Sequence, residues 1–201
     1  MRFNRLIVLV SVVFAAQVFA LAAHACEEYS ALPDRETKEY RDKLLETTAD
    51  PLDRLFAFQK LVCSNNPVIR TYAVREGLKS VSDPLVREQI MFDAMFEKTR
   101  VDIELTPGSD ASAKDKEFSK DASGLISYTV VFKSPQEGCL SIYSTNECNK
   151  GGSIFVKGDK LELNYANMVG EFRLSEANEL VGFIRPAPNG YGRIPAVIRL
   201  F

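Results

Sequence analysis

Few side chains in this 201-residue sequence could carry out catalysis. Its single histidine, His24, lies in an N-terminal segment with a basic start, a long apolar stretch and small residues at positions 23 and 25. This pattern predicts a cleaved secretory signal peptide over residues 1–25 and a mature chain that begins at Cys26. Because that chain contains no histidine, Ser-His-Asp triads, Cys-His dyads and histidine-ligated zinc are excluded. No nucleophile-elbow or phosphate-loop motif occurs either.

Carboxylates are the remaining candidates for acid-base chemistry. A glycosidase needs two carboxyl groups roughly 5–9 Å apart across a cleft. Glu162 and Glu171 lie on segments that we expect to be adjacent strands, so they could face each other. An alternative function is therefore a carboxylate-based hydrolase or carbohydrate-active protein, although a solvated outer sheet face explains the same two residues. The acidic residues between 110 and 121 lack the order of a calcium loop. We expect no catalytic residue, no metal and no cofactor.

The four cysteines are expected to form two disulfides, because exported compartments are oxidising. Three pairings are possible. Two cysteines lie in each half of the chain, so we predict the local pairs Cys26–Cys63 and Cys139–Cys148. In the competing interpretation Cys26 is a lipid-modified first residue, because it directly follows the predicted cleavage point. Against lipidation, Ala23 and His24 do not match the usual residues before a lipidated cysteine.

Charge and hydropathy narrow the possible partners. The formal net charge is −2, and no cluster of lysine and arginine exceeds a dipeptide, so nucleic acid is not an expected partner. After residue 25 no apolar run approaches 18 residues, and we predict no transmembrane span in the mature chain. We expect the protein to be periplasmic or secreted.

A phrase of the form [Asp/Asn]-Pro-x-x-Arg occurs three times between residues 50 and 100, beginning at Asp50, Asn66 and Asp83. Asp or Asn at an N-cap accepts a bond from an otherwise unpaired amide, and proline suits the first helical position. Each phrase is followed by apolar residues at helical spacing, which predicts a buried stripe. The period of 16 to 17 residues is that of one helix and a tight turn, so neighbouring helices should stack antiparallel.

These phrases resemble the HEAT/armadillo class of helical repeats over about residues 50–100. The resemblance implies a stack of packed helices, with a more charged helix from about Asp34 to Thr47 as its cap. The recurring arginines are Arg54, Arg70 and Arg87. They could form a basic ladder that meets an acidic partner, or each could bind a carboxylate or a backbone carbonyl of the neighbouring repeat.

The apolar period changes from 3.6 to 2 at Leu125. About seven short strands follow, which predicts an antiparallel meander or small barrel. The predicted fold class is therefore α+β, with a HEAT-like helical domain over 26–105, a polar linker over 106–124 that almost lacks large apolar side chains, and a β domain over 125–201.

The β domain contains a long loop between two strands, from Arg185 to Arg193, with Tyr191 flanked by glycines. Such loops often bind partners, although an ordered connection is the alternative. Arg173 and Arg185 could also project with Tyr143 into an open barrel mouth and hold an anionic or sugar ligand. We predict a non-catalytic envelope or extracellular protein that binds a partner protein through the helical face and this loop. A small-ligand carrier that uses the β-domain interior is a further alternative.

Overall fold

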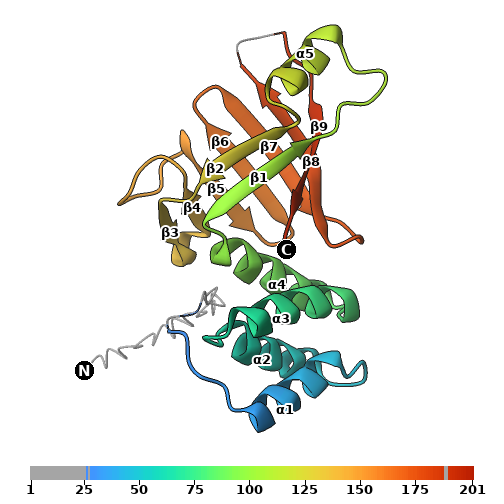
Figure 1. The fold of residues 1–201 in the computed structure, drawn as a ribbon, viewed down its shortest axis with the longest axis vertical. Coiled ribbons are helices and arrows are strands. Elements are labelled where there is room, and N and C mark those ends of the chain that lie inside the picture. The colour runs from blue at the N-terminus through green and yellow to red at the C-terminus, as the bar shows by residue number, and fades with distance from the viewer. Residues whose placement is uncertain (1–25, 27, 188–189) are drawn as a thin grey trace, which may run out of the picture.

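The computed structural model describes residues 26, 28–187 and 190–201. The predicted signal peptide lies outside these residues. The fold class is α+β: four helices stack below a curled antiparallel sheet, and a fifth helix lies at the far end of that sheet (Figure 1). No helix in this part of the chain is both long and apolar enough to cross a bilayer.

The stack consists of α1 (Asp34–Leu45), α2 (Pro51–Val62), α3 (Pro67–Ser80) and α4 (Pro84–Glu97). As predicted, proline is the first residue of the last three helices, and the preceding Asp50, Asn66 and Asp83 each accept a backbone N–H bond. The predicted apolar stripes are buried: Ala57, Phe58, Val62, Ala73, Val74, Leu78, Ile90, Met91 and Met95. Seven consecutive residues of α4, Ile90 to Phe96, are buried because this helix lies between the other helices of the stack and the sheet (Figure 1).

The sheet has nine strands in the order β2-β1-β9-β8-β7-β6-β5-β4-β3. Their bounds are β1 Arg100–Leu105, β2 Leu125–Thr129, β3 Phe132–Ser134, β4 Cys139–Ser141, β5 Gly152–Lys157, β6 Lys160–Tyr165, β7 Met168–Leu174, β8 Glu179–Pro186 and β9 Ile194–Arg199. The two outermost strands, β2 and β3, are consecutive in the chain. Val130 donates its N–H to Thr99 and Val131 donates its N–H to Ser141, so this bent segment curls the sheet toward closure.

Two predicted boundaries differ from the structure. Residues 100–105, predicted to end the helical domain, form β1, which lies next to the edge strand β2 and pairs with β2 and β9. The predicted linker 106–124 contains helix α5 (Ala113–Asp121), whose N-cap is Ser112. The sheet therefore has nine strands rather than about seven, and the chain has five α-helices in its described part.

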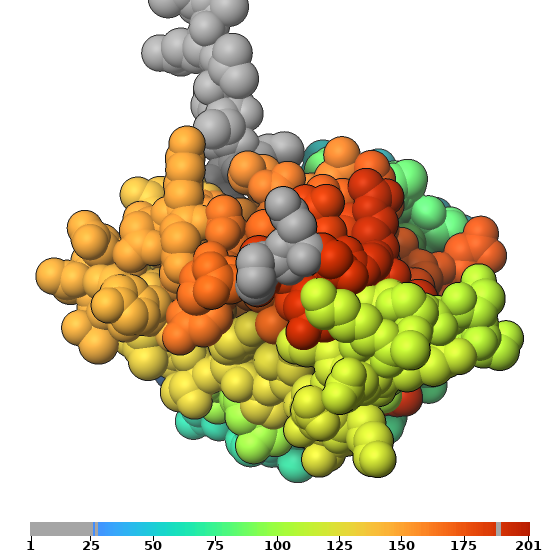
Figure 2. Space-filling model, turned by 90° about the horizontal axis from the view of Figure 1, so that it is seen from above, coloured from blue at the N-terminus to red at the C-terminus, as the bar shows by residue number. Residues whose placement is uncertain are grey.

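Helix α5 is held by the loop before β9. The Gly192 N–H donates to Oδ1 of buried Asp115 at 2.9 Å, and the rings of Phe118 and Tyr191 lie edge to face at 5.5 Å. Figure 2 shows the α5 segment in yellow-green beside the red C-terminal strands. A segment whose composition is typical of a linker thus forms a helix, because the Asp115 carboxylate and the Phe118 ring hold it against the loop before β9.

The inner face of the sheet is filled with large side chains. Ile103, Leu140, Ile154, Leu161 and Phe172 are each almost fully inaccessible to solvent. Gly182 on β8 permits the close curl beside β7, because a Cβ there would lie 1.9 Å from the carbonyl oxygen of Glu171. The interior of the sheet is therefore a packed core.

The structure contains both predicted disulfides. Cys26–Cys63 has a Cα–Cα distance of 5.4 Å and Cys139–Cys148 one of 6.3 Å. Disulfides persist in oxidising compartments, so these bonds indicate a location outside the cytoplasm.

Candidate functional site

The first of the three repeat arginines, Arg54, lies inside the stack and is only 5% exposed. Its Nε donates to the carbonyl oxygen of Leu44 at 3.1 Å and its Nη2 to that of Ser80 at 2.8 Å. These carbonyls belong to the last turns of α1 and α3, where the helix dipoles carry partial negative charge. The guanidinium therefore neutralises two helix C-termini at once.

Arg70 and Arg87 make equivalent links. Arg70 Nη1 donates to the Ser64 carbonyl after α2 at 2.9 Å, and its Nε lies 3.2 Å from Glu97 at the end of α4. Arg87 donates to the Leu78 carbonyl of α3 at 2.6 Å and to the Ser175 carbonyl between β7 and β8 at 3.0 Å. Arg87 thereby joins the stack to the sheet. The three side chains bind carbonyls and a carboxylate within the chain, so they do not form a free basic ladder.

The predicted β-domain loop is also partly occupied by internal contacts. The Tyr191 ring lies against Phe118 and under the ammonium of Lys114, which is 4.3 Å from the ring centroid. The Arg193 guanidinium lies 4.5 Å from the centroid of the Phe183 ring. Arg185 is exposed and lines a groove of about 260 Å³ together with Tyr191. Tyr143 lines none of this groove and is 71% exposed, so it does not join Arg185 at a shared mouth.

The two candidate carboxylates do lie together. Glu162 on β6 and Glu171 on β7 are direct cross-strand partners, and both line a groove of about 370 Å³. Both point to the exposed outer face, and Glu162 pairs with Lys157 at 3.4 Å. A catalytic acid usually needs burial that holds its proton near neutral pH. Solvent surrounds this pair, which suits binding better than proton transfer.

A third groove lies at the helical end, between the N-terminal segment, α1 and α2. It has a volume of about 480 Å³. Leu32, Tyr40, Phe56 and the Cys26–Cys63 disulfide give it an apolar lining, and Glu28, Glu36 and Lys60 line it with charged groups. Phe56 is 60% exposed although phenylalanine is usually buried.

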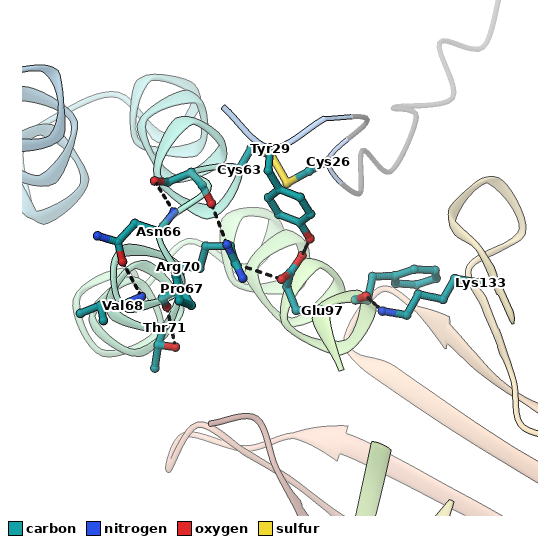
Figure 3. Close-up of polar contacts among 12 residues, drawn as sticks. Cys26, Tyr29, Cys63, Asn66, Pro67, Val68, Arg70, Thr71, Glu97 and Lys133 are labelled. Atoms are coloured by element: carbon teal, nitrogen blue, oxygen red, sulfur yellow. Dashed lines mark hydrogen bonds and ion pairs between the residues drawn. A yellow bond between two sulfur atoms is a disulfide. The ribbon is translucent and has the colours of Figure 1, made fainter. Parts of the chain in front are cut away.

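The N-terminal segment that forms one wall of this groove is fastened on its other side (Figure 3). The Ser30 N–H donates to the Cys63 carbonyl at 3.1 Å, and Asn65 returns a bond to the Ser30 carbonyl at 2.8 Å. The Tyr29 hydroxyl donates to Glu97, and its ring centroid lies 4.7 Å from the Arg70 guanidinium. Burial, followed by the bond to Glu97, raises the pKa of Tyr29 to about 12. Tyr29, Arg70 and Glu97 together are called the clasp below.

One turn before Glu97, Asp93 is 3% exposed on α4. Its Oδ2 accepts a bond from Gln89 at 3.1 Å, whereas Oδ1 is buried without a partner among the described residues. Burial, with a smaller contribution from the negative charge of Glu97, raises the pKa of Asp93 to about 7. A carboxyl that changes charge near neutral pH therefore lies beside the clasp.

The groove and the clasp could not be located from sequence patterns. Phe56 falls within an ordinary helical apolar pattern, which predicts a buried residue. Its exposure depends on how α1 and the N-terminal segment pack beside α2, because these elements form a groove next to Phe56 and do not cover it. Asp93 carried a weak signal, since it is a charged residue in the middle of an otherwise apolar run, Ile90 to Phe96. No group of three or more histidine, cysteine, aspartate or glutamate residues suited to a metal occurs in the described ranges.

Comparison of the chain with known protein families, with curated proteins and with solved structures finds no match.

Proposed function

We propose that this is a non-catalytic protein of the periplasm or the extracellular space that binds a partner protein. The observation that carries the proposal is Phe56, 60% exposed beside an apolar groove with charged groups at its edge. Protein interfaces have an apolar centre, often aromatic, within a polar rim. The chain offers that arrangement at the end of its helical stack.

The chemistry of the groove favours a particular partner segment. Leu32, Tyr40 and the disulfide provide an apolar surface for a bulky side chain. Glu28 and Glu36 place two carboxylates at the groove against the single charge of Lys60, which favours a basic residue next to that side chain. The partner is therefore a protein segment with a large apolar residue beside lysine or arginine.

The other candidate functions have less support. A carrier needs an internal cavity, but Leu140, Leu161 and Phe172 fill the inner face of the sheet. A hydrolase needs a protonated acid, but Glu162 and Glu171 lie on the exposed outer face. Arg54, Arg70 and Arg87 bind within the chain, so the proposed interface uses the groove at the helical end in place of an arginine face.

Site-specific photo-crosslinking tests the proposal. A photoreactive residue at position 56 should capture a discrete protein from an envelope extract, whereas the same residue at position 85 should not. Leu85 is the control because it is also an exposed apolar residue of the stack, 48% accessible, but does not line the groove. Phe56→Asp should abolish capture of the purified partner, and Leu85→Asp should leave it within about twofold, as for surface changes outside an interface.

Equal labelling at positions 56 and 85 would exclude the groove as the interface. Turnover of a wall or sugar substrate that is lost in Glu162→Gln would instead establish the carboxylate-based function.

A further inference from the structure

The groove and the clasp share one segment of the chain. Ser30, Ala31 and Leu32 line the groove, and Tyr29, immediately before them, bonds to Glu97 on α4. The disulfide at Cys26 and the paired backbone bonds of Ser30 fasten the same segment to the end of α2. A change at the clasp must therefore move a wall of the groove.

The clasp includes a built-in electrostatic conflict. Glu97 is already held by the Tyr29 hydroxyl and by Arg70, so that cation is occupied. Asp93, one turn away, has no cation in contact within the part of the chain that the structure describes, and Gln89 satisfies only one of its oxygens. A buried carboxylate without a charge partner is strongly unfavourable, and the like charge of Glu97 adds to the cost.

We infer that the N-terminal segment is a proton-controlled wall of the groove, clasped while Asp93 is protonated and loosened when Asp93 ionises. This inference rests on the proposed function, because the wall it controls belongs to the proposed interface. The Tyr29 phenol lies close enough to Asp93 for the charge of that carboxylate to raise the pKa of Tyr29, so movement of Tyr29 away from α4 would bring water nearer Asp93 and relieve the unpartnered charge.

The groups that face Asp93 support this coupling. Among the described residues, the titratable groups that interact with Asp93 are Tyr29 from the N-terminal segment and Glu97 from α4, and Arg70 from α3 is paired with Glu97. Lys133 of β3 donates to the Phe96 carbonyl, and burial lowers the pKa of its ammonium. Lys133 therefore binds a backbone oxygen at the end of α4 and is not paired with Asp93.

The direction of the pH effect follows from proton binding. In the clasped state Asp93 keeps its proton up to about pH 7, whereas a hydrated Asp93 releases it near its ordinary value of 3.8. The clasped state thus binds more protons between these values, and the open fraction rises with pH by up to about tenfold per unit. Above about pH 7 both states are ionised and the open fraction levels off.

Hydrogen exchange of the mature protein without any partner tests this inference. The reporters are the amides of Ser30 and Asn65, whose bonds fasten the segment. After correction for intrinsic exchange, opening should be at least about tenfold more frequent at pH 7.5 than at pH 5. Asp93→Asn should remove this pH dependence. Asp102→Asn, which changes a more exposed carboxylate on β1, should retain it.

A second variant covers the possibility that Asp93→Asn does not fold. Glu97→Gln removes the negative charge that raises the pKa of Asp93. The pH at which opening of the N-terminal segment levels off should therefore shift to a lower value. Equal exchange at pH 5 and 7.5 in the wild type, or an unchanged levelling-off pH in Glu97→Gln, would overturn the inference. Because no partner is present, either result would leave the role of Phe56 standing, and a failed Phe56 crosslink would leave the proton-controlled wall standing.

Discussion

Replacing Arg54 by methionine should destabilise the protein severely without changing its surface. Methionine fills a similar volume but removes the two bonds to the Leu44 and Ser80 carbonyls, at 3.1 and 2.8 Å. Bonds from a charged donor contribute about 1.5–3 kcal/mol each, so the loss of two bonds should lower the free energy of unfolding by about 3–6 kcal/mol. For a domain of this size each kcal/mol lowers Tm by about 2–4 °C, so we expect a decrease of roughly 10 °C.

Urea unfolding followed by circular dichroism, together with a thermal melt, measures this effect. Arg75→Met is the matched control, because Arg75 is about half exposed and pairs with the adjacent Glu76 at 2.9 Å. That change should cost about 0.5 kcal/mol. Arg54→Lys keeps the positive charge but lacks the forked guanidinium that reaches both carbonyls. Its loss in free energy of unfolding should therefore lie between those of Arg75→Met and Arg54→Met. An Arg54→Met variant within about 0.5 kcal/mol of the wild type would refute the claim that this arginine holds the helix ends together.

Two further changes test the sheet. Gly182→Ala should cost about 3 kcal/mol or more in urea unfolding, because its Cβ would lie 1.9 Å from the Glu171 carbonyl oxygen. Gly151→Ala, with its nearest atom at 4.0 Å, should be neutral, and similar midpoints for the two variants would contradict the close packing. Changing Cys139 and Cys148 together to alanine opens a loop with a sequence separation of 9 and should cost about 2.5 kcal/mol. Peptide mapping of the non-reduced wild type that showed another pairing would exclude this bond.

The helical half could be predicted well because its signals are local. Asp50, Asn66 and Asp83 cap helices through their own side chains, and proline fixes the first turn. Most strands were predicted for a similar reason, since the alternation of apolar and polar residues indicates a strand with one buried face. Strand β1 was missed although Val101, Ile103 and Leu105 alternate with acidic residues, because it directly follows α4 and was assigned to the helical domain.

Helix α5 could not be predicted from its composition. It contains one large apolar residue, Phe118, and depends on a ring and a backbone amide from the loop before β9, more than 70 positions away. A segment with so little apolar surface folds only where distant residues dock it.

The sequence alone determined the helix starts, the change of apolar period and the disulfide pairs. Each depends on residue type or on spacing within a few turns of chain. Only the tertiary structure decided the roles of charged and exposed residues. The repeat arginines meet carbonyls of two other elements, Phe56 is left uncovered, and Asp93 is buried beside Glu97. Burial and electrostatic environment are set by neighbours distant in sequence, and no local pattern encodes them.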